Sequence, residues 1–190
     1  MLNTTPNGEG APAHLYTGAP APAAPAASPR LLSLDDLAAL DTEALAALYR
    51  AARTPALADL DGDLRGRMLA VRGAGPFLRA RLAAFARWKG FPWKGKSFRS
   101  HGSERGEGIN RVLSAARPRR WFRFETFIAP SRAGGFDAVQ LDYDNPDNPF
   151  FIRPIKDEVR EVSPGLFLGQ AYLQTRHRLR LVLYFGLARA

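Results

Sequence analysis

Most of the chain after residue 90 alternates apolar and polar residues with the period of two that is typical of β-strands. Residues that favour turns, such as Gly, Pro, Asn and Asp, separate these runs. An earlier run, residues 63–71, alternates in the same way after an Asp-Gly pair. Seven further runs cover residues 93–98, 108–114, 119–129, 135–143, 157–162, 166–174 and 178–188. The pattern therefore predicts a mainly β protein with about eight antiparallel strands.

Eight short strands in one chain can close into a barrel, which leaves no edge strand exposed. The interior of such a barrel is filled by side chains or holds one small ligand. An open, curved sheet wrapped on N-terminal helices fits the same pattern. We therefore expect an antiparallel barrel or a strongly curved sheet, in a mainly β (α+β) protein whose N-terminal helices pack over one end.

Helical patterns occur in two places. Ser33 can cap a first helix with Asp36 in the capping-box position, and a second helix starts at Asp41. Residues 76–89 return to helical spacing and end at Gly90. These patterns predict two short N-terminal helices and one helix inserted after the first strand.

The organisation of the chain follows from these elements and from one low-complexity stretch. Residues 11–29 are mostly Ala and Pro, and proline this dense blocks a helix and offers little to bury. We expect a disordered tail over 1–30 and a single domain over 31–190. Within that domain we expect a helical lead-in over 31–57 and a β-rich barrel over 61–190, with the inserted helix over 76–89.

The composition excludes several kinds of site. The chain has no cysteine, and therefore no thiolate nucleophile and no zinc or iron–sulfur site built from cysteines. Its histidines, His14, His101 and His177, are too far apart for a local metal-binding pair. We therefore expect no metal and no other cofactor, and a binding protein is favoured over an enzyme. No basic leader and no apolar run of about 18 residues occurs, so a cytoplasmic protein without a membrane span is expected.

The positive charge is concentrated in the middle of the chain. The formal net charge is +9, and residues 72–132 hold fifteen Lys and Arg against three Asp and Glu. Such a segment either faces water or binds nucleic acid or another polyanion. The second alternative predicts a contiguous exposed face made of Arg79, Arg87, Lys94, Lys96, Arg117, Arg119 and Arg120.

One segment matches a phosphate-binding pattern in its letters alone. Residues 90–97, GFPWKGKS, fit GxxxxGK followed by Ser. A phosphate loop joins a buried strand to a helix, whereas here a helical pattern precedes the segment and a strand pattern follows it. We therefore interpret the segment as a strand anchored by Trp93, with exposed lysines.

Several late strands carry charged residues among apolar ones. Phe122, Phe124, Thr126 and Ile128 should face the main core, and Trp121 should point to the face opposite Phe122. If the interior of the barrel takes the mixed faces instead, polar groups converge in a partly apolar cavity of the kind that binds small molecules. The same groups could form a buried ion network that is purely structural. The candidate ligand-binding residues are Trp93, Arg123, Glu125, Gln140, Asp142, Arg153, Glu158 and Tyr172.

The segment 143–165 gives a more specific prediction. Two Asn-Pro pairs force turns, so Phe150, Phe151 and Ile152 should insert into the core. We expect Arg153, together with Asp157 or Glu158, to point inward. Their predicted partners across the barrel mouth are Asp142, Glu125 and Arg123.

The motif WKG at residues 93–95, followed by a meander of short strands, resembles the lipocalin-like (calycin-type) small barrels and the related GxWxG-containing proteins. Phe91 stands where the full GxWxG motif has its first glycine, so only Trp93 and Gly95 carry the resemblance. It implies a β-barrel around an apolar ligand such as a fatty acid. We expect a protein that binds a small, partly apolar or amphipathic molecule in a barrel cavity. The alternative is a binder of nucleic acid or another polyanion through residues 72–132.

Overall fold

The computed structural model describes Met1 and residues 32–71, 93–113 and 118–189. The expected helix over 76–89 and nearly all of the expected tail over 1–30 lie outside the described residues. Both therefore stay predictions.

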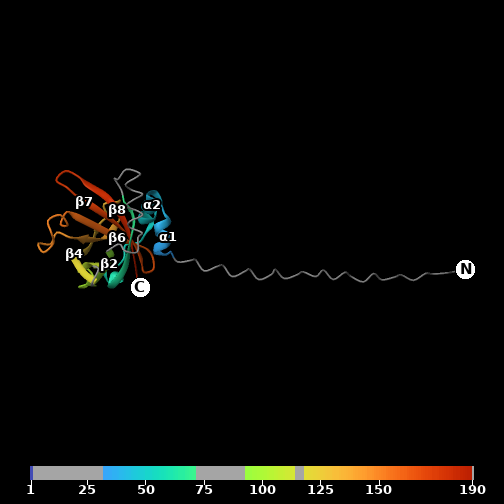
Figure 1. Ribbon diagram of the computed structural model, residues 1–190. Coiled ribbons are helices and arrows are strands. Elements are labelled where there is room, and N and C mark those ends of the chain that lie inside the picture. The colour runs from blue at the N-terminus through green and yellow to red at the C-terminus, as the bar shows by residue number, and fades with distance from the viewer. Residues whose placement is uncertain (2–31, 72–92, 114–117, 190) are drawn as a thin grey trace. The chain divides into compact units, whose positions relative to one another are not determined.

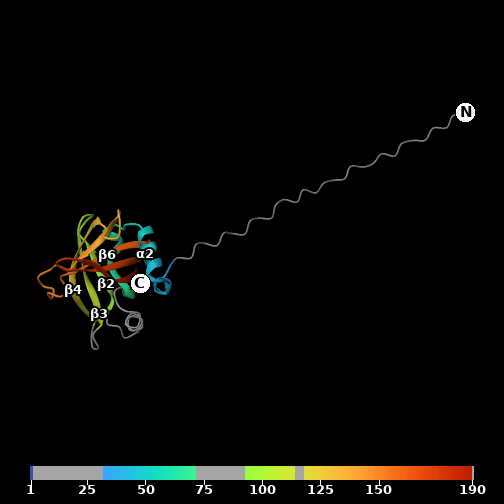
Figure 2. The ribbon, with the colours of Figure 1, turned by 90° about the horizontal axis from the view of Figure 1, so that it is seen from above.

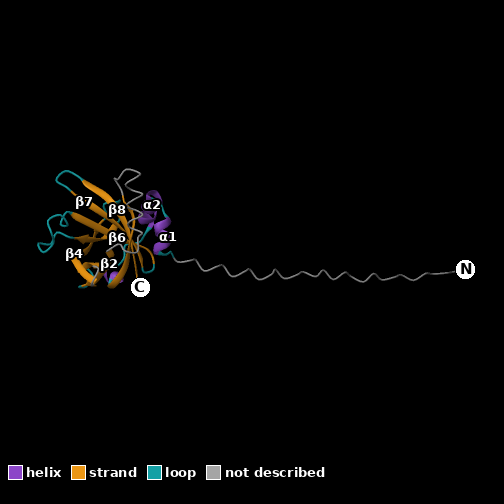
Figure 3. Ribbon diagram, in the orientation of Figure 1, coloured by secondary structure: helices purple, strands orange, loops and turns teal. Residues whose placement is uncertain are grey.

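Eight antiparallel strands form one closed barrel, in which each strand pairs with the next along the chain (Figures 1 and 3). The last strand pairs with the first, from Leu64 opposite Arg189 to Val71 opposite Leu183. The barrel prediction is therefore confirmed, and the open curved sheet is not formed. The strands are β1 (Gly62–Val71), β2 (Trp93–Ser100), β3 (Gly106–Leu113), β4 (Pro118–Pro130), β5 (Asp137–Asp142), β6 (Ile155–Ser163), β7 (Leu166–Gln174) and β8 (Leu179–Arg189).

Two short helices precede the barrel, α1 (Leu34–Ala39) and α2 (Thr42–Ala51). The predicted capping box of α1 is present: the backbone N–H of Asp36 donates to Ser33 Oγ at 3.2 Å, and that of Ser33 donates to Asp36 Oδ2 at 2.9 Å. Asp41 caps α2 by accepting from the backbone N–H of Ala44 at 2.8 Å. Local side-chain chemistry therefore sets both helix starts.

The helices cover the outer wall of the barrel rather than one of its ends (Figures 1 and 2). Leu45 and Tyr49 of α2 are buried against Leu168 of β7 and Tyr184 of β8. These strand residues point outward, so without α2 they would expose a large apolar patch. A 3-10 helix, η1 (Leu57–Leu60), follows α2 and leads into β1.

The interior of the barrel is packed at the end where β1 begins. Leu57 and Leu60 of η1 are buried in one cluster with Leu64, Phe98 and Phe124. The predicted inward face of β4 is confirmed at Phe124 and Thr126, which are 1% and 3% exposed. This end of the barrel is therefore closed by side chains.

Aromatic rings inside the barrel lie over glycines of neighbouring strands. A Cβ atom at Gly169 of β7 would lie 2.2 Å from the ring of Phe185 in β8, and one at Gly108 of β3 would lie 2.3 Å from the ring of Phe124. Because glycine has no side chain, these two positions leave the space that the rings of Phe185 and Phe124 occupy.

Gly169→Ala should therefore destabilise the protein by about 1–3 kcal/mol, because its Cβ overlaps the Phe185 ring. Gly135→Ala is the control, since a Cβ there meets nothing within 4 Å. Its free energy of unfolding should change by less than about 0.5 kcal/mol. Urea unfolding of both variants tests this packing, and equal stabilities of the two would contradict it.

Candidate functional site

A cavity of about 490 Å³ lies inside the barrel, between the packed core and the end opposite η1. Apolar side chains form most of its wall, among them Met68 of β1 and Leu183 of β8. Trp121, Phe151 and Leu173 line it and are 42%, 60% and 38% exposed. The cavity therefore opens to solvent at the end where these three residues lie.

Four buried polar side chains meet where this cavity borders the packed core. Lys96 of β2, Asn110 of β3, Tyr143 after β5 and Asp157 of β6 all line the cavity, and none is more than 7% exposed. We call these four residues the polar cluster. Lys96 and Asn110 lie on neighbouring strands, whereas Tyr143 and Asp157 lie 47 and 61 residues beyond Lys96, and the closed barrel brings the two pairs together.

Lys96 lies at the centre of the polar cluster. Its ammonium group donates to Asp157 Oδ2 at 3.1 Å, to Asn110 Oδ1 at 2.9 Å and to the hydroxyl oxygen of Tyr143. The lysine and aspartate side chains are 4% and 6% exposed. They form a buried ion pair whose desolvation is offset by charge attraction and by additional hydrogen bonds.

The other members of the polar cluster are bonded to one another. The Tyr143 hydroxyl donates to Asp157 Oδ2 at 3.0 Å. Asn110 Nδ2 donates to Tyr143 Oη at 3.2 Å and to the backbone oxygen of Phe122 at 3.3 Å. Trp93 Nε1 donates to Asn110 Oδ1 at 3.0 Å, which fixes the indole ring beside the cluster.

Aromatic rings surround the Lys96 ammonium. Its nitrogen lies 5.6 Å from the ring centroid of Trp93, 5.1 Å from that of Phe124, 5.2 Å from that of Tyr143 and 5.2 Å from that of Phe185. Each distance falls in the range of cation–π attraction. The rings therefore stabilise the charge while keeping water away from it.

Burial shifts the pKa values of two groups in the polar cluster. It lowers the pKa of Lys96 from its usual 10.5, and the nearby Asp157 carboxylate opposes this change. It raises the pKa of Tyr143 above its usual 10.0, and the negative charge of Asp157 acts in the same direction. The tyrosine hydroxyl therefore remains a proton donor to Asp157 at neutral pH.

A β-bulge shapes the open end of the cavity. Phe122 has φ 60°, and the register of β3 and β4 shifts between Ile109 and Asn110. The prediction that Trp121 and Phe122 point to opposite faces is therefore wrong, because the extra residue changes the alternation. Both side chains line the cavity, and their ring centroids are 6.0 Å apart.

Three candidate residues lie on the outer face of the barrel instead of in its interior. Glu158 accepts from Ser131 Oγ at 2.7 Å and from the Arg132 guanidinium at 3.2 Å, and Gln140 Nε2 donates to it at 3.4 Å. The guanidinium carbon of Arg132 also lies 5.7 Å from the Tyr172 ring centroid. Gln140, Glu158 and Tyr172, which are buried, thus form an outer network with Ser131 and the more exposed Arg132. Glu158 is buried and hydrogen-bonded there, as expected for a buried ion network with a purely structural role.

The expected interior position of Arg123 and Glu125 is wrong. Both are exposed, and Glu125 lies 3.9 Å from the guanidinium of Arg105. The regular alternation of β4 sends them outward because Phe124 and Thr126 point inward. Among the candidate ligand-binding residues, Trp93 alone lines the cavity.

The expected inward pairing of Arg153 is also wrong. Arg153 is 44% exposed and pairs with Asp144 at 2.7 Å, and Asp142 pairs with Lys156. Asp157 does point inward, with Lys96 as its partner. Arg153 lies in the turn before β6 begins, so its position is not fixed by the strand alternation.

Phe150 and Phe151 do not insert into the core as expected. They are 83% and 60% exposed, while Ile152 packs against the interior cluster. Asn148 explains the course of this turn, because its side-chain amide donates to the backbone oxygens of Arg123 at 2.7 Å and Tyr143 at 2.9 Å. The turn is therefore tied to the barrel through Asn148, with Phe150 exposed and Phe151 at the rim of the cavity.

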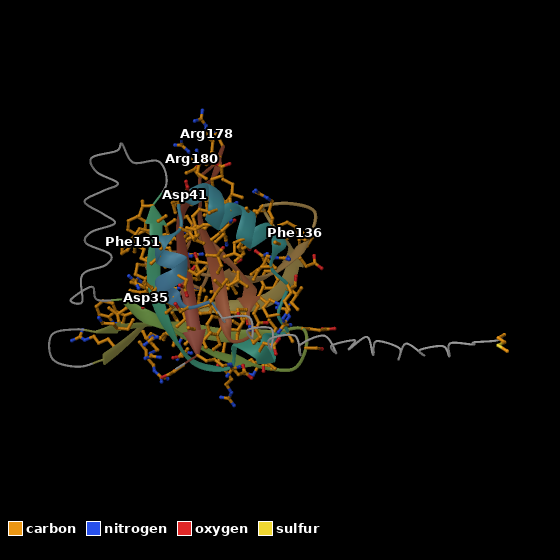
Figure 4. All side chains as sticks on the ribbon, turned by 90° about the vertical axis from the view of Figure 1, so that its right-hand side faces the viewer. Asp35, Asp41, Phe136, Phe151, Arg178 and Arg180 are labelled. Atoms are coloured by element: carbon orange, nitrogen blue, oxygen red, sulfur yellow. The ribbon has the colours of Figure 1, made fainter. Side chains whose placement is uncertain are left out.

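The expected basic face is only partly described. Arg119 and Arg120 are exposed, but Lys96 is buried and cannot contribute to such a face. Arg79, Arg87 and Arg117 lie outside the described residues. Exposed cations also occur elsewhere: Figure 4 shows Arg178 and Arg180 projecting from the barrel near the turn between β7 and β8. Polyanion binding through residues 72–132 stays a prediction.

In the part of the chain that the structure describes, no group of three or more His, Asp and Glu side chains is placed to hold a metal ion. In that same part, no helix is long and apolar enough to cross a membrane.

Comparison with known proteins gives information on the fold alone. No family model matches the chain, and no curated protein matches its sequence. Its structure is similar to the crystal structure of a protein from Thermomonospora curvata, with a TM-score of 0.52 and 18% sequence identity. The match covers 80% of this chain and 88% of that one. The likeness extends over most of both chains and supports a shared fold.

The buried ion pair can be tested with a double-mutant cycle. Lys96→Met and Asp157→Leu should each cost about 3–5 kcal/mol, because each leaves one buried charge without its partner. The double variant should cost clearly less than the sum of the two, as measured by urea unfolding.

Lys156 and Asp142 provide the control pair, since their side chains are 14% and 34% exposed. Their coupling should be about 0–1 kcal/mol. If the Lys96 and Asp157 substitutions are additive, the two groups do not interact in the folded protein.

The raised tyrosine pKa values predict a loss of stability in alkali. Burial raises the pKa of Tyr143, and it also raises the pKa values of Tyr49 and Tyr172. The native state therefore keeps these protons above pH 10, where an unfolded tyrosine releases them. The contribution of these protonated tyrosines to the free energy of unfolding is therefore at its full value below that pH and decreases above it.

Tyr143→Phe removes one such group from both states. The free energy of unfolding of this variant should therefore decline less steeply than that of the parent between about pH 9 and about pH 11. Urea titrations at several pH values give both slopes. An unchanged slope would contradict the raised pKa of Tyr143.

Proposed function

We propose that this protein binds a small, largely apolar molecule in the barrel cavity, with the polar end of the ligand at the polar cluster. The observation that carries the proposal is an apolar cavity of about 490 Å³ with a few buried polar groups at one place. Small-molecule sites typically have volumes of about 300–1,000 Å³, with mostly apolar walls and a few polar groups that orient the ligand.

The two ends of the barrel support one direction of entry. Leu57 and Leu60 fill the interior at the η1 end, whereas the other end has a rim of partly exposed apolar side chains. Trp121, Phe151 and Leu173 belong to both the rim and the cavity wall. An apolar molecule that enters there loses contact with water stepwise before its polar end meets Lys96 and Asp157.

The lipocalin-like resemblance at Trp93 and Gly95 agrees with this function. Trp93 lines the cavity and donates to Asn110 of the polar cluster. Gly95 has φ +133°, and a Cβ there would lie 2.0 Å from the backbone oxygen of Leu64. Glycine at this position lets β2 approach β1 closely and places Trp93 and Lys96 toward the interior.

Val182→Trp should abolish binding, because Val182 lines the cavity wall and a larger ring there fills the space. Leu179→Trp is the matched control on the same strand, since Leu179 is 45% exposed and does not line the cavity. Native mass spectrometry should show a co-purified small molecule on the parent and on the control. The parent and Leu179→Trp should also bind an added apolar fluorescent probe, whereas Val182→Trp should not.

Equal probe binding by both variants would contradict a ligand site in the cavity. Complete absence of binding by the parent, with native mass spectra free of any adduct, would contradict the function itself. The unfolding curve of Val182→Trp checks that lost binding does not reflect lost folding.

A further inference from the structure

The hydrogen-bond donors of the polar cluster all have acceptors within the protein. The three protons of the Lys96 ammonium match Asp157 Oδ2, Asn110 Oδ1 and Tyr143 Oη. Both protons of the Asn110 amide are donated, one to Tyr143 Oη and one to the backbone oxygen of Phe122. The Tyr143 hydroxyl donates to Asp157 Oδ2.

Trp93 completes this set, because its only donor, Nε1, is used on Asn110 Oδ1. A ligand that enters the cavity therefore meets no free donor in the polar cluster or on Trp93. A group that can only accept, such as an ether or ester oxygen, would be buried there without a partner.

One acceptor in the polar cluster has no partner among the described residues. Asp157 Oδ1 is buried and receives no hydrogen bond, although Asp157 Oδ2 receives two. Asp157 as a whole is 5% exposed and lines the cavity. Oδ1 has almost no accessible surface, so a donor from the cavity reaches it only after the Asp157 carboxyl group turns. Because a buried carboxylate oxygen without a donor is costly, such a donor would then stabilise it.

The charges in the polar cluster restrict the ligand further. Lys96 and Asp157 form one cation and one anion, which balance each other, and their side chains are only 4% and 6% exposed. A ligand carboxylate would add a second anion beside Asp157, and a ligand ammonium would add a second cation beside Lys96. Either would be buried without its own counter-ion.

We propose that the polar end of the ligand is an uncharged hydrogen-bond donor, a hydroxyl or amide N–H on an apolar body, which donates to Asp157 Oδ1. This inference rests on the proposed function, because it specifies the chemistry of a ligand in the same cavity. It differs from the fatty acid that the lipocalin-like resemblance implies. The carboxylate of a fatty acid has no free donor to meet at this site.

The test compares four ligands that share one alkyl chain: decanol, decanoate, decylamine and the methyl ether of decanol. Their dissociation constants for the parent protein are measured at neutral pH from the fluorescence of the cavity tryptophans, Trp93 and Trp121, or by displacement of an apolar probe. Decanol should bind at least about tenfold more tightly than the ether, because only the alcohol can donate to Asp157 Oδ1. Decanoate and decylamine should also bind more weakly than decanol.

The possible outcomes separate the inference from the proposed function. If decanoate, decylamine or the ether binds as tightly as decanol, the donor inference is overturned while the cavity remains a binding site. If none of the four compounds and no apolar probe binds, the proposed function fails and the inference fails with it.

Asp157→Asn provides a second measurement. It replaces the carboxylate, of which only Oδ1 lacks a partner, with an amide of the same shape, so the preference for decanol over the ether should fall to near unity. Asp142→Asn is the matched control, because Asp142 pairs with Lys156 and does not line the cavity. Asp142→Asn should keep the preference of the parent for decanol over the ether. If both variants lose this preference to the same extent, the proposed role of Asp157 is overturned. If Asp157→Asn does not fold, the ligand series on the parent protein still decides the matter.

Discussion

The burial of the Lys96 ammonium inside the barrel is the constraint on which the rest of the structure depends. Moving one such charge out of water costs several kcal/mol, so it needs compensation from every side. Asp157 supplies the opposite charge, Asn110 and Tyr143 supply further acceptors, and four aromatic rings surround the nitrogen. Removing any of these groups leaves a buried charge that is less well compensated, which lowers the free energy of unfolding.

The same constraint divides the interior into two parts. Towards η1, Leu57, Leu60 and Phe124 fill the space, and the rings that cover Lys96 need glycines on the neighbouring strands to make room. Towards the opposite end, apolar walls continue without being filled, which leaves the cavity. The polar cluster lies at the border between the two parts, and none of its four residues is more than 7% exposed.

The barrel could be predicted because each strand leaves a local signal in the sequence. The run 166–174 coincides with β7 (Leu166–Gln174), and the run 157–162 lies within β6 (Ile155–Ser163). The members of the site were harder to predict, because alternation separates two faces of a strand without showing which face is inside. The bulge at Phe122 also changes the alternation in a way that no local residue pattern marks.

A signal for the polar cluster was present in the sequence. Lys96 shares a strand face with Phe98, and Asp157 shares one with Val159, so each charge has an apolar neighbour on its own face, although Glu161 continues the face of Asp157. Two opposite charges placed in this way on different strands indicate an interior pair. The sequence-based expectation of exposed lysines in 93–98 was wrong for Lys96. Charged residues are usually exposed and are rarely buried unless they are paired, and the partner of Lys96 lies on a strand distant in the sequence.

The most direct test of the buried Lys96 ammonium is its own titration, followed by carbon-13 NMR of the lysine side chains. The Lys96 resonance, assigned by its loss in Lys96→Met, should titrate at a lower pH than the usual lysine value of 10.5, because burial disfavours its charge. A Lys96 resonance that titrates at or above that usual value would contradict the claim that burial dominates the environment of the ammonium.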